Sequence, residues 1–506
     1  MSEETFDYVV VGAGSAGAVV ARRLVDAGAS VALVEAGGGA TNPAIADPGR
    51  SHELWFSPED WGYRTDPQHA CLDREIHWPR GRVLGGSSAL NGMIYVRGHR
   101  ADFDAWAMHG CPGWGYEDVL PFFKRSEDSD LGPSDVHGVG GPMRVISDYP
   151  RHPVNAAMVA ASIEAGIPVD PDCNDGDPNG VGFAQLHIRD GRRESAASAF
   201  LDPIAGAERL TPITGATATG LRFDGERCVG VDAGPRTIRA DGEVILCAGT
   251  IGSAELLLRS GIGPAGELGE LGIAVRADLP GVGRNLHDHL VVPVIVDSPR
   301  PIPPALPGLT QLHSQLFWRS RSGLIAPDIQ PLCFHVPVYD PTWMEGPADA
   351  YTLYAGLIRP MSRGALRLRS ADPNVPPELD PRLLSASADV DVLVDALALV
   401  REIIGQPALR EWSAAERYPG ADVRSAGQLR DYVRRAAVSY HHQVGTCRMG
   451  RDAEAVVDPE LRVHGFEGLR VADASVMPFV TSGNTAAATM MIGERAAELL
   501  SRPDSI

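Results

Sequence analysis

The alternation of apolar and polar residues at the start of the chain predicts a strand, a helix and a second strand. Residues 7–11 read D-Y-V-V-V, which is typical of a buried strand. Ala16, Val20 and Leu24 then recur at helical spacing, and a second apolar run, V-A-L-V, ends at Glu35. Two buried strands joined by a helix predict a parallel α/β unit of the Rossmann type.

The turn between the first strand and the helix reads G-A-G-S-A-G from Gly12 to Gly17. Gly12 lets the chain turn sharply, Gly14 lets the backbone approach a pyrophosphate, and Gly17 lets the helix pack closely against the strand. The helix N-terminus, at Ser15 and Ala16, then faces the anion. The spacing therefore predicts a dinucleotide site.

Glu35 narrows the choice of dinucleotide. A carboxylate at the end of the second strand accepts hydrogen bonds from both ribose hydroxyls, whereas it repels a 2′-phosphate. The local pattern thus predicts FAD or NAD, excludes NADP, and leaves the first two open.

Further along, the pattern changes several times. Residues 39–76 show little periodicity and suit a long surface excursion, and a second glycine-rich loop with a short helical stretch follows at 79–97. Residues 210–249 contain strands in quick succession, and the final apolar helix is expected from Thr485 to about Leu500. We expect an FAD-binding or NAD-binding fold at 1–150, a mixed connection at 151–200, a return to the nucleotide fold at 201–289, a second, sheet-containing domain at 290–440, and a last return at 441–506.

Composition limits the class of protein. A chain of 506 residues with 44% hydrophobic residues can bury a large core and suggests two or more domains. Its 45 basic and 65 acidic residues give a formal charge of −20, which argues against nucleic acid as a partner. The composition does not indicate an oligomeric state.

Targeting signals and cysteine usage suggest a location. The first strand begins almost at Met1, which leaves no space for a signal segment, and the densest apolar run, near Val392 to Val400, is interrupted by Asp395. Seven cysteines lie far apart without a C-x-x-C pair. We expect a cytoplasmic protein with reduced thiols and no membrane span.

Six blocks, in order, carry a resemblance to a known family. They are G-A-G-S-A-G at 12–17, P-R-G-R-V-L-G-G-S-S-A-L-N-G at 79–92, S-G-I-G-P at 260–264, G-R-N-L-H-D-H at 283–289, H-Q-V-G-T-C-R-M-G at 442–450 and V-A-D-A-S-V-M-P at 471–478. Together they resemble the glucose–methanol–choline (GMC) flavoprotein oxidoreductases, and choline-dehydrogenase-like bacterial members look most similar. The resemblance implies FAD rather than NAD, and oxidation of an alcohol to a carbonyl. It also implies a Rossmann-like FAD-binding domain that is discontinuous in sequence, with a substrate-binding α+β domain whose sheet is mostly antiparallel.

The resemblance also implies the catalytic residues. Alcohol oxidation removes a hydroxyl proton and a hydride, so a base is needed near neutral pH, and histidine suits that role. His442 matches the family's catalytic histidine, whereas its neighbour His441 does not match that position and could line the pocket. Asn484 matches the second catalytic position, where a neutral amide could orient the substrate oxygen and stabilise its charge. Asn484 also suits a helix N-cap, and both roles can hold together.

The cofactor positions are carried over by motif, and so is one departure. The predicted FAD contacts are Gly12, Gly14, Ser15, Ala16, Gly17, Glu35, Ala36, Gly86, Ser87, Asn91, Gly92, Ile94, Ala218, Ala248, Asp473, Ala474, Asn484 and Thr485. Some choline-oxidising relatives attach FAD through a histidine just before the asparagine of the second block, where this chain has Leu90. The resemblance therefore implies noncovalent FAD.

Several alternatives remain open at this level. His287, Asp288 and His289 are of metal-ligating types, but they belong to a family block, and we expect no metal site. The partners expected are a small-molecule alcohol and oxygen or another electron acceptor. The rival functions are a hydroxynitrile-lyase-like enzyme, in which FAD is structural, and a noncatalytic flavoprotein. The particular alcohol, and the choice between oxidase and dehydrogenase, are not indicated.

Overall fold

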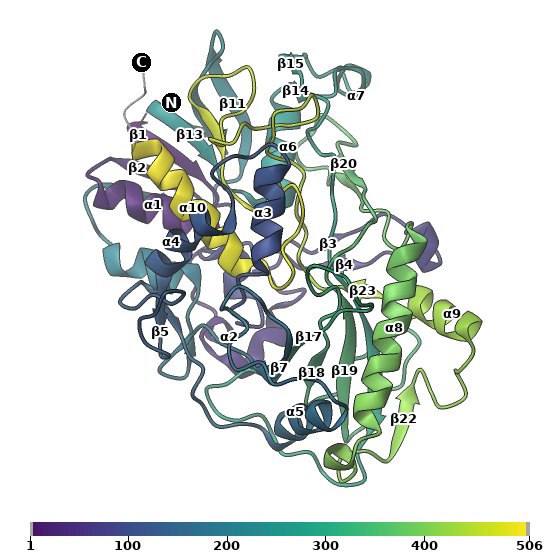
Figure 1. Cartoon of the computed structure of the whole chain (residues 1–506). Helices are drawn as coiled ribbons and strands as arrows, with labels where there is room; N and C mark the ends of the chain where they lie inside the picture. The colour runs from purple at the N-terminus through teal and green to yellow at the C-terminus, as the bar shows by residue number, and fades with distance from the viewer. Residues whose placement is uncertain (1–3, 502–506) are drawn as a thin grey trace.

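The computed structural model describes residues 4–501 and contains two seven-stranded sheets (Figure 1). The first sheet has the order β10-β2-β1-β13-β12-β11, with β24 paired to β13. Its central pairs are parallel, while β11, β12 and β13 form an antiparallel meander. The strands are β1 (Glu4–Val11), β2 (Val31–Val34), β10 (Leu210–Ile213), β11 (Ala218–Asp224), β12 (Arg227–Ala233), β13 (Arg236–Leu246) and β24 (Leu469–Val471).

The two ends of the chain meet over this sheet. Helix α1 (Ser15–Asp26) packs beside the last helix, α10 (Ala486–Ser501), and α10 also contacts α4 (Tyr116–Ser126) (Figure 1). Gly493 makes this approach possible, because a Cβ there would lie 2.8 Å from the carbonyl oxygen of Ala16. Arg23 of α1 bonds the buried Glu494 of α10 through two nitrogens, at 2.9 and 2.7 Å. The final helix thus completes the fold that the first strand begins.

The second sheet is antiparallel throughout, with the order β22-β16-β19-β18-β17-β7 and β23 paired to β16. Its strands are β7 (Gly180–Phe183), β16 (Leu290–Asp297), β17 (Leu312–Phe317), β18 (Leu332–Phe334), β19 (Ala350–Leu357), β22 (Ala415–Tyr418) and β23 (Val438–Ser439). Helix α8 (Ser387–Ile404) packs on β19 and on α9 (Ala426–Ala436), and α5 (Pro153–Glu164) packs on β17 and β7. A Rossmann-like unit and an antiparallel α+β unit confirm the predicted fold class.

Short elements connect the two sheets. The helices are α2 (Pro43–Ala46), α3 (Arg100–Met108), α6 (Gly249–Arg259) and α7 (Ala265–Glu270), with single 3-10 or π turns at Pro48–Leu54, His69–Cys71, Gly86–Ala89, Ala197–Leu201, Asp202–Ile204, Pro407–Leu409 and Ala474–Val476. The two-stranded sheets pair β3 (Tyr63–Arg64) with β4 (His77–Trp78), β5 (Glu127–Ser129) with β6 (Met143–Val145), β8 (Ile188–Arg189) with β9 (Arg192–Arg193), β14 (Ile262–Gly263) with β15 (Ala277–Asp278), and β20 (Ala365–Arg367) with β21 (Glu378–Asp380).

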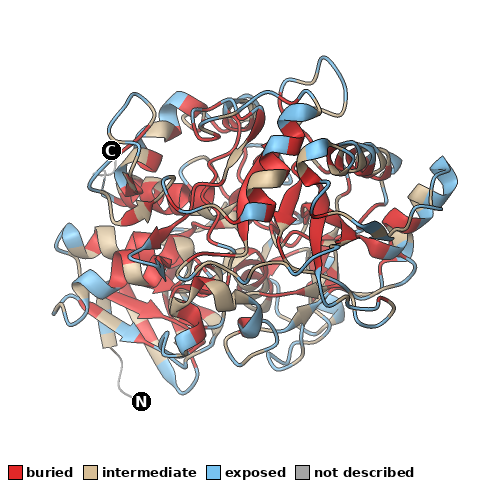
Figure 2. Ribbon diagram, turned by 90° about the horizontal axis from the view of Figure 1, so that it is seen from below, coloured by how far each residue is buried: buried red, intermediate tan, exposed pale blue. Residues whose placement is uncertain are grey.

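The buried residues concentrate on the strands and on the helix faces that cover them, while exposed residues lie mostly at the periphery (Figure 2). All seven cysteines are buried and free. Within residues 4–501, no helix combines the length and the apolar character needed to cross a membrane. The densest apolar run of the sequence lies in α8, whose charged and polar positions break it as expected.

Candidate active site

A cavity of about 1350 Å³ is lined by residues from both large sheets. Of the predicted FAD contacts, all but Gly17 lie in its wall, namely Gly12, Gly14, Ser15, Ala16, Glu35, Ala36, Gly86, Ser87, Asn91, Gly92, Ile94, Ala218, Ala248, Asp473, Ala474, Asn484 and Thr485. His441 and His442 line the same cavity. Residues as far apart in sequence as Gly12 and Thr485 therefore border one space.

The first glycine turn has the geometry that its spacing predicts. Gly12 has φ of 100°, a left-handed conformation that favours glycine. A Cβ on Gly17 would overlap the carbonyl oxygen of Gly12, which explains why Gly17 lies outside the cavity wall. Gly17 lets α1 pack against β1, and Gly12 and Gly14 remain at the cavity surface.

The two glycine-rich loops meet at Gly14 and Gly86. Gly86 has φ of 52°, and a Cβ there would lie 2.6 Å from the Cα of Gly14. The next residue, Ser87, accepts a hydrogen bond from the amide of Gly81 at 3.1 Å, which stabilises the second loop. The glycine backbone of the two loops therefore forms one floor of the cavity, which a pyrophosphate can approach closely.

Glu35 is held at the edge of this floor. Its carboxylate accepts hydrogen bonds from the amides of Ala13 (3.0 Å) and Gly37 (2.8 Å). Burial raises the pKa of Glu35, and the two amide donors act in the opposite direction. Each carboxylate oxygen retains a further lone pair, so the ribose role predicted for Glu35 fits its position.

Three helix N-termini face the cavity. Ser15 begins α1, Gly249 begins α6 and Thr485 precedes α10, and all three residues line the wall. Asp473 stabilises the N-terminus of α6. Its carboxylate accepts hydrogen bonds from the amide of Gly249 at 2.8 Å and from the hydroxyl of Ser253 at 2.6 Å. Helix N-termini stabilise negative charge, so the cavity suits a dinucleotide with an anionic pyrophosphate.

The two predicted catalytic residues are in direct contact. The side-chain amide nitrogen of Asn484 lies 3.2 Å from Nε2 of His442. The amide oxygen of Asn484 accepts a hydrogen bond from Nε2 of Gln330, also at 3.2 Å. Helix α10 begins at Ala486, and Thr485 takes the preceding position and accepts from the amide of Thr489. The Asn484 side chain is therefore directed into the site instead of capping the helix.

His442 has a second histidine on its other ring nitrogen. Its Nδ1 lies 3.0 Å from Nδ1 of His289, and both rings are buried. Since Asn484 donates to Nε2 of His442, we assign the proton to Nδ1 of His442, which donates to His289. Burial and the neighbouring histidines His289 and His441 hold the pKa of His442 well below its usual range. His442 is thus a neutral imidazole whose Nε2 lone pair faces the site.

The backbone at His442 is fixed by Asp288. Its carboxylate accepts from the amide of His442 (2.8 Å), from Nε2 of Gln443 (3.0 Å) and from the hydroxyl of Ser439. Burial raises the pKa of Asp288 to about 6, and these donors oppose the rise. His441 has φ of 67°, so this segment departs from extended backbone just before His442.

The loop that carries Asn484 is fixed by Asp102 of α3. This buried carboxylate accepts from the amide (2.6 Å) and the hydroxyl (2.8 Å) of Ser482. It also accepts from Nη1 of Arg359 (2.5 Å), which in turn donates to the hydroxyl of Ser482 (2.8 Å). Arg359 follows β19 of the second sheet, so the contact joins that sheet, helix α3 and the Asn484 loop.

The triplet His287, Asp288 and His289 is not arranged as a ligand set. His287 accepts from the amide of Val480 at 3.0 Å, Asp288 holds the His442 backbone and His289 contacts the His442 ring. Each side chain thus makes its own contact within the protein, two of them with His442. In residues 4–501 there is no cluster of three or more His, Cys, Asp or Glu residues suited to a metal ion.

Sequence reasoning missed Gln330, His289 and Asp102 as parts of the site. Gln330 lies in a segment without a motif, and the sequence places His289 in a family block without assigning it a role in the site. The segment 39–76, expected as a surface excursion, contributes Trp55 to the cavity wall, where its ring packs edge-on against His441 at 5.1 Å. Phe334 also lines the cavity, whereas Phe317, Trp318 and His335 are absent from its wall.

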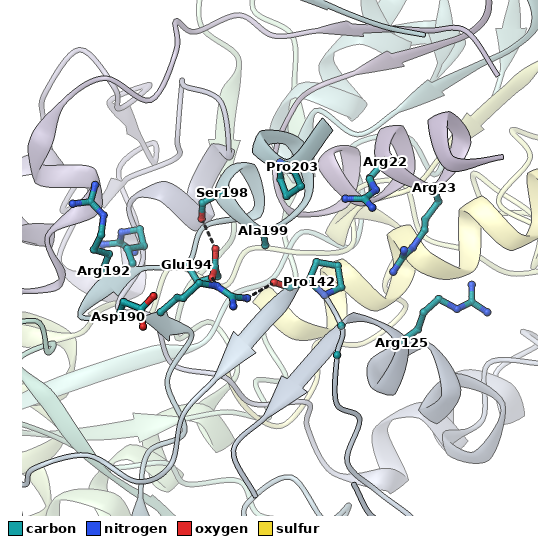
Figure 3. A pocket seen from close by; sticks show the side chains of 14 residues that line it. Arg22, Arg23, Arg125, Pro142, Asp190, Arg192, Glu194, Ser198, Ala199 and Pro203 are labelled. Carbon is teal, nitrogen blue, oxygen red and sulfur yellow. Dashed lines mark hydrogen bonds and ion pairs between the residues drawn. The ribbon is translucent and has the colours of Figure 1, made fainter. Parts of the chain in front are cut away.

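A second cavity of about 710 Å³ shares no lining residue with the first (Figure 3). Several arginines border it, and many have carboxylate partners: Arg22 with Asp26, Arg23 with Glu494, Arg125 with Glu498, and Arg189 with Glu194. Its charges are thus largely paired within the protein, and none of the predicted site residues lies there.

Comparisons with known proteins agree with this geometry. The family models described as GMC oxidoreductase match residues 6–291 and 360–493. An oxygen-dependent choline dehydrogenase from Brucella ovis is 39% identical, over 97% of this chain and 95% of its own length. The crystal structure of pyridoxine 4-oxidase from Mesorbium loti has a TM-score of 0.93 at 36% identity, and covers 97% of this chain and 98% of its own. A formate oxidase from Aspergillus oryzae, studied for modification of its FAD, has a TM-score of 0.90 at 26% identity, and covers 99% of this chain and 98% of its own.

The chain therefore belongs to the GMC oxidoreductase family. It is an FAD-dependent oxidoreductase that acts on CH–OH groups. Membership of the family confirms the resemblance that the six sequence blocks carry. It also decides between FAD and NAD in favour of FAD.

Proposed function

We propose that His442 is the base and Asn484 the oxygen-binding amide of an alcohol-oxidising site. The observation that carries this assignment is the contact between the two side chains at 3.2 Å, at the wall of the cavity that the glycine loops and three helix N-termini border. Nε2 of His442 takes the hydroxyl proton of the alcohol. Nδ2 of Asn484 donates a hydrogen bond to the alcohol oxygen and stabilises the negative charge that develops there.

Bound FAD supplies the acceptor for the hydride that leaves the alcohol carbon. The residues that would hold it are the glycine turn at Gly12 and Gly14, the loop at Gly86, and Glu35. His289 accepts a hydrogen bond from the protonated Nδ1 of His442, so Nε2 of His442 carries no proton and can act as the base. The low pKa of the buried His442 keeps its imidazole neutral before the reaction.

We further propose that FAD is bound noncovalently. Leu90, at the position where some relatives carry the attaching histidine, lines the cavity and has no nucleophilic atom. The reduced cofactor would pass its electrons to oxygen or to another acceptor. The seven buried free thiols suit a reducing compartment such as the cytoplasm.

Anaerobic mixing of the holoenzyme with alcohols tests the proposal. An alcohol oxidoreductase bleaches the flavin absorbance, because the hydride is transferred to the cofactor. A hydroxynitrile-lyase-like enzyme or a noncatalytic flavoprotein would leave the flavin oxidised with every alcohol. The matched positions of His442 and Asn484, and their mutual contact, favour the oxidoreductase.

A further inference from the structure

One face of the second sheet forms an apolar wall beside the active site. Side chains alternate between the two faces of a strand, and the lining residues are spaced by two: Val291 and Pro293 on β16, and Leu332 and Phe334 on β18. Tyr354 of β19 lies between them, in register with both Pro293 and Leu332. These five residues are called the apolar wall below.

The apolar wall begins where the catalytic contacts end. Gln330 lies two residues before Leu332 and donates to Asn484. Tyr440 donates its hydroxyl to the carbonyl oxygen of Gln330 at 3.3 Å, and its ring stacks on His442 at 4.8 Å. An alcohol whose oxygen lies between His442 and Asn484 therefore directs its substituent along this sheet face.

The apolar wall offers no anion to a charged substituent. The carboxylates that line the cavity come from other segments: Glu35, Asp66, Glu75, Glu255, Asp340 and Asp473. Asp340, the nearest to the wall in sequence, accepts from the amide and hydroxyl of Thr342 in its own turn. Phe334 and Tyr354 pack edge-to-face against each other, with centroids 5.8 Å apart. A cation placed on the apolar wall would thus lose water without gaining a carboxylate partner.

We infer that the substrate is an uncharged alcohol with a bulky apolar or aromatic substituent, and that choline is a poor substrate. This inference rests on the proposed function. A sugar would leave its hydroxyls unpaired along the wall, and an ammonium group would leave a charge unpaired. An apolar substituent instead buries its own surface and that of the apolar wall away from water, which favours binding.

Two alcohols of the same shape test the inference directly. Choline and 3,3-dimethylbutan-1-ol differ by a charged nitrogen in place of a carbon. The measured quantity is the rate constant of flavin reduction divided by the apparent dissociation constant of the alcohol, for the holoenzyme under anaerobic conditions. We expect this ratio to be at least about tenfold higher for 3,3-dimethylbutan-1-ol and for benzyl alcohol than for choline. Binding of each alcohol, read from the perturbation of the oxidised flavin spectrum, should follow the same order. An equal or higher value for choline would overturn the inference while leaving alcohol oxidation intact. Flavin that no alcohol reduces would contradict the proposed function itself.

A matched pair of variants locates the substituent. Leu332→Asp and Leu332→Asn have nearly the same shape, and only the first adds a charge to the wall. We expect Leu332→Asp to move the ratio of choline to 3,3-dimethylbutan-1-ol towards choline by about tenfold or more, and Leu332→Asn to leave that ratio near its original value. Phe334→Asp, at a less buried position of the wall, gives the same readout if Leu332→Asp does not fold. An unchanged ratio in a folded, FAD-containing Asp variant would show that the substituent binds elsewhere.

Discussion

Gln330 donates a hydrogen bond from its amide nitrogen to the amide oxygen of Asn484, at 3.2 Å. This contact determines which end of the Asn484 amide faces His442. With its oxygen engaged, Asn484 presents its nitrogen to Nε2 of His442. Gln330, which lies in no recognisable motif, thus determines that the alcohol oxygen meets the amide nitrogen of Asn484.

Replacing Gln330 by Glu should reverse the Asn484 amide. A carboxylate cannot donate, so Asn484 would turn its nitrogen towards residue 330 and its oxygen towards His442. We expect the rate of flavin reduction to fall by about 10- to 100-fold, with little change in FAD content. Gln311→Glu is the control, because Gln311 lines the same cavity, whereas the side chain of Asn484 bonds Gln330 and His442. Equal losses in both variants would assign the effect to the added charge instead of the amide orientation.

Asp102 should act on catalysis through the Asn484 loop. Asp102→Asn keeps the size of the side chain but removes the charge that holds Ser482 and Arg359. We expect the variant to lose about 2 kcal/mol of unfolding free energy and to lower kcat more than it raises KM. Asp104→Asn, an exposed position of the same helix, should change neither quantity appreciably. If thermal stability falls while kcat is retained, Asp102 is structural only.

The buried histidines His152, His313 and His335 predict a pH-dependent stability. The ring of His152 stacks on His335 at 3.7 Å, and burial lowers the pKa of His313 to about 4 and that of His335 to about 3. In the unfolded chain these groups bind protons near pH 6.5, so their contribution to stability is complete above pH 6.5 and is lost as the pH falls towards 4. Each group should contribute a slope of up to about 1.4 kcal/mol per pH unit in this range.

The variant His335→Phe isolates one of these groups. Its melting temperature should depend less steeply on pH between 6.5 and 4.5 than that of the original protein, whatever its absolute value. His69→Phe, at a side chain that is 99% exposed, is the matched control and should keep the original slope. Parallel curves for His335→Phe and the original protein would contradict the account of this cluster.

The flavin should separate from the protein on denaturation. Acid precipitation of the holoenzyme is expected to leave the yellow colour in the supernatant, because Leu90 offers no atom for attachment. Released flavin that matches FAD by chromatography and mass would agree with this expectation. Flavin retained in the washed precipitate would show a covalent bond and would require a different attachment residue.

The sequence predicts best what depends on local backbone geometry. The roles of Gly12 and Gly17 follow from a spacing of five residues, since the turn and the helix packing are made within that span. The second sheet was also predictable as a sheet-containing region. The start of the last helix differs by one residue, because Thr485 precedes it and Ala486 begins it.

Long-range contacts account for what the sequence did not reveal. Gln330, His289 and Asp102 reach the site only when the two sheets are assembled, and the nearest pairing, His289 with His442, spans 153 positions. The side-chain direction of Asn484 likewise follows from Gln330 and not from the helix that it precedes. No periodicity or local motif encodes such contacts.

Anaerobic stopped-flow reduction of the variant His442→Ala shows whether His442 removes the alcohol proton in the FAD-dependent oxidation. With an alcohol that reduces the original holoenzyme, we expect His442→Ala to retain its FAD and its fold, while the rate of flavin reduction falls by about 10²- to 10⁴-fold. An FAD-containing variant that reduces at the original rate would contradict this role of His442.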